Sequence, residues 1–497
     1  MKRFFILLIV FAASSSVMAQ FRPLKKRRHN VNKAVKQIAA APDFKTAGFA
    51  FLAQDVNSGE IISAYNPDMA LRPASTLKLL STATALELLT PDYRYITVLE
   101  YSEKIDTIRH ILNGNIIIKG GGDPTLGSGY FDQTKSKQFL KQWKEAVNRL
   151  GIDSVTGSVI ADASLFSHEM VPPSWSWQNI GNYFGAGPCG LTIEDNTYSI
   201  YFNTGAKVGD TAKPVKISPT IPGLIIENHV TADSVNWDNS IIFGAPYGKK
   251  RVIRGELPVG RHLFRVKGSM PDPAYIAAWQ LDSVLNAAGI RIAGSPTTLR
   301  RLKEKGSSLL FHGTPFDTLF SPPLSQIIAQ TNIHSINLFA EHCALSAGIA
   351  LGATPETIVA MDSIISFWFA KGMDTEGIRL TDGSGLSQYD VITPRQMVFL
   401  LTYMKNNSHW FNAYYQSLAV GGETGTLKDL FFNTAARGNI HAKSGTIDGA
   451  KAYSGYVTSR SGRQIAFSMM VNNFSGSSRE AKAKLTYLMN ALAEFNR

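Results

Sequence analysis

Alternating apolar and polar positions near the two ends of the chain predict the strands of a single sheet. Residues 47–66 form the pattern of two strands around an Asn57-Ser58-Gly59 turn, which is typical of a hairpin. Residues 479–495 have the spacing of an amphipathic closing helix. Two strands from the N-terminal end and three from the C-terminal end would make one five-stranded, mostly antiparallel sheet. With helices covering this sheet, the pattern predicts an α+β domain built from both ends of the chain. The three C-terminal strands are expected at 438–447, 450–459 and 463–473.

The middle of the chain has a different pattern. From about Asp92 to about Thr298 it consists of short β-like runs separated by glycine and proline. Apolar residues between Phe139 and Leu150 keep helical spacing and predict one helix there. The region is therefore interpreted as a large β-rich insertion within the first domain, with two nested lobes expected. Further helices are expected within 273–289, 321–351 and 356–372.

The N-terminus indicates an exported protein. Met1-Lys2-Arg3, a short apolar run and small residues ending at Ala19 are typical of a secretory signal peptide, and the run is too short to span a membrane. We expect a mature chain that begins near Gln20 and is periplasmic or otherwise secreted. The predicted division is a signal peptide at 1–19, a basic arm at 20–44, a discontinuous domain at 45–95 and 299–497, and the insertion at 96–298.

Most of the positive charge lies in the arm. The chain has a formal net charge of +12, of which two come from the leader and seven from lysines and arginines between residues 21 and 37, leaving about +3 elsewhere. Two interpretations remain open: electrostatic association with an anionic envelope surface, or a solvated leader without a partner. An exported protein with a nearly neutral body is not expected to bind nucleic acid.

Two cysteines, Cys189 and Cys343, are too few for a disulfide framework in a chain of 497 residues. A single bridge between them is possible in an oxidising compartment. Two buried thiols are the favoured state, because free cysteine behaves as a small hydrophobic residue.

Candidate chemistry begins in the predicted helix at 72–89. Ser75 and Lys78 lie three positions apart and so on one helix face, which lets a neutral lysine take the proton of a serine nucleophile. The pKa of the lysine must fall by about 3 for this, and burial among leucines together with a neighbouring positive charge would lower it. Taken alone, the pair also fits a capping serine beside a snorkelling lysine.

Two later motifs favour the catalytic interpretation. Ser335 and Asn337 stand at a helix start, and Lys443-Ser444-Gly445, followed by Thr446, lies on a predicted strand. S-x-x-K, S-x-N and K-[ST]-G in this order are what a penicillin-recognising serine acyltransferase needs.

Each residue of these motifs has a physical task. We expect Ser335 to relay a proton and Asn337 to hold a substrate amide. Gly445 would let a substrate backbone lie along the strand. The N–H groups of Ser75 and Thr446 would form an oxyanion hole. Binding of the terminal carboxylate is expected from Lys443 and the hydroxyls of Ser444 and Thr446.

With these motifs the chain resembles the D-alanyl-D-alanine carboxypeptidases/endopeptidases of the penicillin-binding protein 4 family, the DacB-like serine D,D-peptidases. The resemblance implies a penicillin-binding/β-lactamase-like transpeptidase domain with a two-lobed insertion. It also implies hydrolysis of peptidoglycan stem peptides through an acyl-enzyme on Ser75, with Lys78 as base, Ser335 as relay and Lys443 at the carboxylate, and inhibition by β-lactams. The likeness begins near residue 45, and similar stretches are 120–126, 321–341, 381–397, 421–431 and 441–457.

The chain departs from that family at two places. Ser444 stands where threonine is usual, which keeps the hydroxyl. Gln178 and Asn179 follow the second tryptophan of 173–187, where the family often has acids that are thought to grip the diamino acid side chain. The third residue of the stem peptide is therefore left open, as is the balance of carboxypeptidase and endopeptidase activity.

Two alternative functions share parts of this pattern. A β-lactamase has the same three motifs and differs in deacylation, although the large insertion argues against it. A catalytically idle cell-wall-binding protein is disfavoured by the intact Ser75, Lys78, Ser335 and Lys443. No cofactor or metal is expected: the glycine-rich 119–125 segment lacks the phosphate-loop spacing, and His342 beside Cys343 is not a ligand cluster.

Overall fold

The strands predicted at the two chain ends form one antiparallel sheet in the computed structural model, which describes residues 31–306 and 313–496. The five predicted strands are confirmed. A sixth strand of two residues at the edge is too short to leave a pattern in the sequence. In spatial order the strands are β18 (Ala419–Val420), β19 (Ile440–Ile447), β20 (Ala450–Thr458), β21 (Gln464–Asn472), β1 (Gly48–Asp55) and β2 (Ile61–Tyr65).

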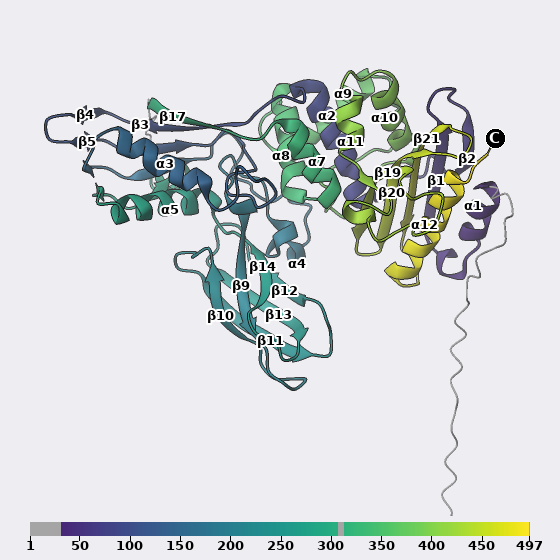
Figure 1. The fold of residues 1–497 in the computed structure, drawn as a ribbon, viewed down its shortest axis with the longest axis horizontal. Helices are drawn as coiled ribbons and strands as arrows, with labels where there is room; N and C mark the ends of the chain where they lie inside the picture. Colours follow the sequence, from purple (N-terminus) through teal and green to yellow (C-terminus); the bar gives the residue numbers. More distant parts are fainter. Residues whose placement is uncertain (1–30, 307–312, 497) are drawn as a thin grey trace, which may run out of the picture.

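Helices cover both faces of this sheet (Figure 1). Phe49 and Phe51 of β1 pack in a core with α1 (Val31–Ala39) and α12 (Ser478–Ala493), whereas Ala50 and Leu52 pack in a second core on the other face. This alternation is the period-two pattern of a strand buried on both sides. We call the sheet with all these helices the sheet domain. The second face is covered by α2 (Lys78–Leu89), α7 (Leu324–His334), α8 (Asn337–Ala350), α9 (Thr357–Ala370), α10 (Pro394–Asn406) and α11 (Phe411–Gln416).

Part of the predicted basic arm is folded. In α1, Val31, Ala34, Val35 and Ile38 are buried against the core that contains α12, while the lysines of the helix are exposed. These apolar positions follow the i, i+3, i+4, i+7 spacing, which the dense positive charge around them concealed. The predicted arm at 20–44 therefore includes a helix that packs on the sheet. Residues 20–30 and the predicted signal peptide lie outside the described residues.

The insertion has two lobes that share one apolar core (Figure 1). The first lobe contains α3 (Gln138–Arg149), which is the helix predicted there, together with α5 (Pro273–Ala287) and α6 (Leu299–Glu304). One of its sheets has, in spatial order, the strands β16 (Thr297–Thr298), β8 (Val159–Asp162), β6 (Ile116–Lys119), β3 (Ile96–Tyr101) and β17 (Thr314–Phe320). Its other sheet has the strands β15 (Arg291–Ile292), β7 (Ser154–Val155), β5 (Ile111–Asn113) and β4 (Lys104–Asp106). The second lobe contains two three-stranded sheets. In spatial order, one has the strands β10 (Lys213–Ser218), β9 (Thr197–Asn203) and β14 (Phe264–Ser269), and the other has β11 (Ile225–Asp233), β13 (Lys250–Pro258) and β12 (Asn239–Phe243).

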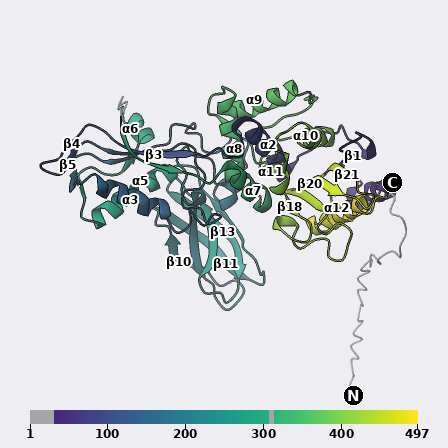
Figure 2. The ribbon, with the colours of Figure 1, turned by 45° about the horizontal axis from the view of Figure 1, so that its top comes forward.

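The insertion ends later in the chain than its sequence pattern suggests. Strand β17 pairs antiparallel with β3, so the chain returns to the sheet domain near Ser321 and not at residue 299. Pairing between strands about two hundred residues apart leaves no local signal. In both views α2, α7 and α8 lie between the six-stranded sheet and the insertion (Figures 1 and 2).

Within residues 31–306 and 313–496, no helix combines the length and the apolar character needed to cross a membrane.

Candidate active site

Ser75 and Lys78 lie at the start of α2 and face each other. Ser75 is in a 3₁₀ turn, Ala74–Leu77, and Lys78 is the first residue of the α-helix that follows, so the predicted helix begins later than residue 72. The three-residue spacing brings Nζ of Lys78 to 3.0 Å from Oγ of Ser75. The preceding residue, Ala74, has a φ of 46°, which is a strained conformation for a side chain with a Cβ.

Lys78 is completely buried and has three oxygen neighbours. Besides Ser75, Nζ is 2.6 Å from Oδ1 of Asn337 and 2.7 Å from the carbonyl oxygen of Ser384. An ammonium group would donate one hydrogen to each. A neutral amine has only two hydrogens, and the amide and carbonyl oxygens can only accept. In that form the lone pair is left for the Ser75 hydroxyl, which must donate its proton to the amine.

Burial is the main reason why this amine can be neutral. It lowers the pKa of Lys78 to about 7, against the opposing influence of the nearby carboxyl groups of Asp382 and Glu341. The pKa of Lys443 is also lowered, first by burial and then by Lys78. Burial is thus the cause that lowers the pKa of Lys78, and the neighbouring positive charge that was also expected to lower it is not among the causes.

The turn between α7 and α8 brings the second motif into the same cluster. Ser335 ends α7 in a left-handed conformation, with a φ of 61°, and Asn337 begins α8. Oγ of Ser335 accepts a hydrogen bond of 2.8 Å from Nζ of Lys443, which also donates to the carbonyl of Ser444 at 2.7 Å. The five side chains therefore form two hydrogen-bonded groups, one of Ser75, Lys78 and Asn337 and one of Ser335 and Lys443. The two groups are electrostatically linked, because the charge of Lys78 lowers the pKa of Lys443.

Asn337 is occupied in a way that differs from the expectation. Its Oδ1 accepts from Lys78, and its Nδ2 donates to the carbonyl of Phe184 at 2.7 Å. Both polar atoms of the amide thus have partners within the protein, and the expected contact with a substrate amide stays a prediction. Gln178 and Asn179 lie on α4 (Trp177–Ile180), in the segment of the insertion that leads to Phe184.

Strand β19 presents an open edge beside the nucleophile. β18 pairs with it only at Ala442 and His441, so from Lys443 to Ile447 this edge has no partner strand among the described strands. The hydroxyl of Ser444 donates to Oγ1 of Thr426 at 2.9 Å. The exposed Thr446 accepts from Nζ of Lys451 at 3.1 Å. An extended peptide could add to such an edge by main-chain hydrogen bonds.

Gly445 has a structural role in the protein itself, and its role in accommodating a substrate backbone stays a prediction. A Cβ at this position would lie 2.6 Å from the carbonyl oxygen of Pro73 and 3.0 Å from the backbone nitrogen of Ser75. Both are backbone atoms and cannot move aside cheaply. The glycine therefore allows β19 to approach the Ser75 turn closely.

Gly445→Ala is consequently expected to slow acylation of Ser75 by fluorescent penicillin about 10²-fold, because the strand and the nucleophile move apart. Overpacking should also lower the free energy of unfolding by about 1–3 kcal/mol. Gly129→Ala is a matched control, because a Cβ there meets no atom within 4 Å. Labelling of Gly445→Ala at the wild-type rate would show that this close approach is unimportant.

Sequence reasoning missed the buried loop that follows Thr381. Oδ1 of Asp382 accepts the N–H groups of Ser384 and Gly385 at 3.0 and 2.5 Å, so the carboxylate shapes the loop whose carbonyl contacts Lys78. Glu341 accepts from the N–H of Gly383 at 2.9 Å. Burial, and then Asp382, raise the pKa of Glu341 to about 8. The Asp-Gly-Ser-Gly sequence is a turn signal, but nothing local indicates that the turn is buried under a lysine.

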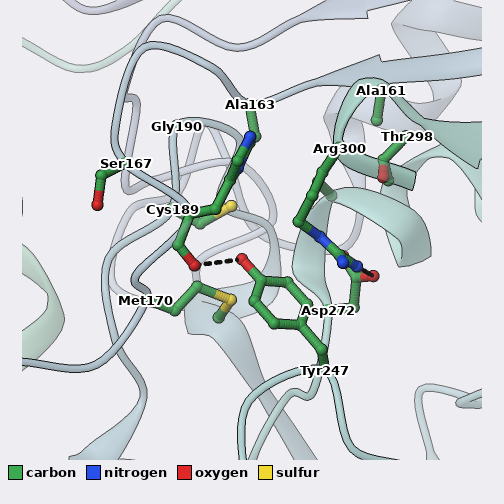
Figure 3. Close-up of a pocket in the computed structure, with 12 residues that line it drawn as sticks. Ala161, Ala163, Ser167, Met170, Cys189, Gly190, Tyr247, Asp272, Thr298 and Arg300 are labelled. Atoms are coloured by element: carbon green, nitrogen blue, oxygen red, sulfur yellow. Dashed lines mark hydrogen bonds and ion pairs between the residues drawn. The ribbon is translucent and has the colours of Figure 1, made fainter. Parts of the chain in front are cut away.

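Other candidate residues lie elsewhere. Cys189 and Cys343 are both free and buried, as favoured from the sequence. Cys189 lines a small cavity in the insertion, beside Tyr247 and Arg300 (Figure 3). With a volume of about 10 Å³ this cavity has room for about one water molecule and is too small for a substrate. The buried His342 contacts the carbonyl of Gly122 through Nδ1 and Oγ1 of Thr192 through Nε2.

The chain is similar to known proteins over most of its length. The model of the D-Ala-D-Ala carboxypeptidase 3 (S13) family matches residues 31–494. The chain is 27% identical over 481 residues to the D-alanyl-D-alanine carboxypeptidase of Actinomadura sp., covering 90% of this chain and 82% of that protein. It is 23% identical over 441 residues to the D-alanyl-D-alanine carboxypeptidase DacB of Haemophilus influenzae, covering 87% of each.

A solved structure shows the same fold. The crystal structure of penicillin binding protein 4 (dacB) from Haemophilus influenzae superposes with a TM-score of 0.79 at 20% sequence identity, covering 94% of this chain and 100% of that one. The predicted α+β fold of the penicillin-binding type, with a large insertion, is therefore confirmed.

Proposed function

The chain belongs to the D-Ala-D-Ala carboxypeptidase 3 (S13) family, and from this premise we propose that it is a serine D,D-peptidase with Ser75 as nucleophile. It would hydrolyse D-Ala-D-Ala termini, D-Ala cross-links or both in peptidoglycan stem peptides, and β-lactams would acylate the same serine. Export after cleavage near Ala19 is part of the proposal.

One observation carries the proposal. Two oxygens that can only accept, on Asn337 and Ser384, lie 2.6 and 2.7 Å from Nζ of Lys78 and take both hydrogens of its neutral form. The remaining lone pair faces the hydroxyl of Ser75, 3.0 Å away. This is the arrangement that general-base activation of a serine needs.

In the proposed acylation step, Lys78 accepts the Ser75 proton while Oγ attacks the carbonyl carbon of the penultimate D-alanine. The bond from carbon to the leaving amine then breaks, and Ser335, beside Lys443, gives its hydroxyl proton to that amine and regains one from the Lys78 ammonium, which returns Lys78 to its neutral form. In deacylation, neutral Lys78 accepts a proton from the water that attacks the ester and returns it to Oγ of Ser75 as the ester bond breaks, which releases the shortened peptide and free Ser75. The N–H groups of Ser75 and Thr446 are proposed to stabilise the oxyanion, which is supported by the close approach of β19 to the Ser75 turn.

Substrate binding is proposed at the open edge of β19. A stem peptide in extended conformation would form main-chain hydrogen bonds to residues 443–447, where the strand has no partner among the described strands. Its terminal carboxylate would meet Lys443 and the hydroxyls of Ser444 and Thr446. Lys451, which contacts Thr446, adds a second cation there.

The test combines two measurements on the wild-type protein. After incubation with benzylpenicillin, mass spectrometry of a digest should locate the penicilloyl group on the peptide that contains Ser75. Purified muropeptides ending in D-Ala-D-Ala should release D-alanine. An unmodified Ser75 peptide, or failure both to release D-alanine and to cleave D-Ala cross-links in muropeptides, would overturn the proposal. Rapid turnover of a chromogenic cephalosporin would replace it with a β-lactamase.

A further inference from the structure

The insertion contacts the surroundings of Lys78 at two points. The carbonyl of Phe184 accepts a hydrogen bond of 2.7 Å from Nδ2 of Asn337. The indole Nε1 of Trp175 donates to Oδ2 of Asp382, also at 2.7 Å. Both insertion residues belong to the same short segment, and Trp175 is 4% exposed. Phe184 holds the side chain of Asn337, whose Oδ1 contacts Lys78. Trp175 holds Asp382, and the loop that follows Asp382 presents the carbonyl oxygen of Ser384 to Lys78.

The first contact fixes which end of the Asn337 amide faces the lysine. The Phe184 carbonyl can only accept, so it selects the amide nitrogen. Oδ1 is then directed at Nζ of Lys78, 2.6 Å away. A flipped amide would place its N–H donors against the lysine and its oxygen against the carbonyl oxygen of Phe184, leaving buried polar groups unpaired.

The second contact completes the hydrogen bonding of the Asp382 carboxylate. Oδ2 accepts from Trp175 and from the N–H of Ser387, both at 2.7 Å, in addition to the two N–H groups on Oδ1. These bonds hold the loop in which Ser384 presents its carbonyl to Lys78 at 2.7 Å. The loop is fastened on its other side by Ser81, whose hydroxyl donates to the carbonyl of Gly383 at 2.6 Å.

We propose that Trp175 is a positioning residue for the reaction, through which the insertion holds the loop of Ser384, one of the two acceptors that orient the Lys78 amine. The inference rests on the proposed function. The insertion thus helps to position groups of the catalytic site, although it lies outside the sheet domain. The lone pair of Lys78 points at Ser75 only while its two hydrogens have fixed acceptors, and both acceptors are held from the insertion.

The test is Trp175→Phe, which keeps an aromatic ring and removes the N–H donor. Penicillin titration first counts the competent sites, so that unfolded protein is excluded. Per titrated site, acylation by benzylpenicillin is expected to slow by about 10- to 100-fold, as for a lost hydrogen bond to a charged group. On a D-Ala-D-Ala peptide kcat should fall by a similar factor, with KM unchanged within about twofold.

Trp368→Phe provides the matched control. Trp368 is a buried tryptophan of the sheet domain whose Nε1 donates to Oγ1 of Thr84 at 2.8 Å, so its replacement removes the same type of bond away from the Asp382 loop. It should lower the melting temperature to a similar degree and leave the acylation rate per site unchanged.

A second variant guards against misfolding of Trp175→Phe. Replacement of Trp175 by 3-benzothienylalanine keeps the ring shape and exchanges the N–H for sulfur, and it should show the same slow acylation. Wild-type rates per site in these variants, or equal slowing in Trp368→Phe, would overturn the inference. Failure of the wild-type protein to form any adduct would instead reject the proposed function.

Discussion

Ser75→Ala is expected to leave no covalent adduct with benzylpenicillin and to lower D-alanine release from muropeptides by at least about 10⁴-fold. The hydroxyl of Ser75 is the group that Nζ of Lys78 contacts at 3.0 Å, and alanine offers no oxygen for an ester. The fold should persist, because alanine fits the backbone of the turn and Ser75 is only partly buried. Intact-mass spectrometry and a coupled assay for D-alanine measure the two effects.

Ser363→Ala is a suitable control for this variant. Its hydroxyl donates only to the carbonyl of Val359 within its own helix, at 3.0 Å, so both activities should remain at the wild-type level. A penicilloyl adduct that survives in Ser75→Ala would place the nucleophile at another residue and would end the present account of the site.

Lys78→Met is expected to slow acylation of Ser75 by about 10³- to 10⁴-fold, because the general base is removed. Methionine has an unbranched chain of similar length, so it can fill the buried space that the lysine occupies. The residual rate should come from the remaining binding contacts and oxyanion donors. Stopped-flow acylation by a reporter β-lactam, combined with circular dichroism, separates lost chemistry from lost structure.

Lys371→Met, at an exposed lysine on the end of α9, should leave the rate unchanged. If folded Lys78→Met acylated within about tenfold of wild type, the Ser75 proton would have to leave by another route. Ser335, the other hydroxyl in the cluster, would then be the first candidate for examination.

Much of the sheet domain could be predicted because its signals are local. Period-two patterns and glycine turns indicated β1, β2, β19, β20 and β21, and the three motifs carried their residue types at fixed spacings. The contact between Ser75 and Lys78 is likewise a consequence of helical geometry three residues apart. Such features need no knowledge of how distant segments meet.

The remaining features depend on contacts between distant segments. Helix α1 is buried only because α12, more than four hundred residues later, packs near it. The role of Gly445 becomes visible only when β19 is placed against Pro73 and Ser75. Asp382 and Trp175 lie about two hundred residues apart in the chain and meet beside Lys78. No pattern within either segment predicts these pairings.

The pH dependence of Ser75 acylation tests the central claim most directly. Burial lowers the pKa of Lys78 to about 7, so the amine is neutral above this pH and protonated below it. The rate constant for acylation by benzylpenicillin is therefore predicted to rise with pH, to pass its half-maximal value near pH 7 and to reach a plateau by about pH 8.5. A rate that is flat from pH 5 to 9, or that is still rising tenfold per pH unit at pH 9, would contradict the account.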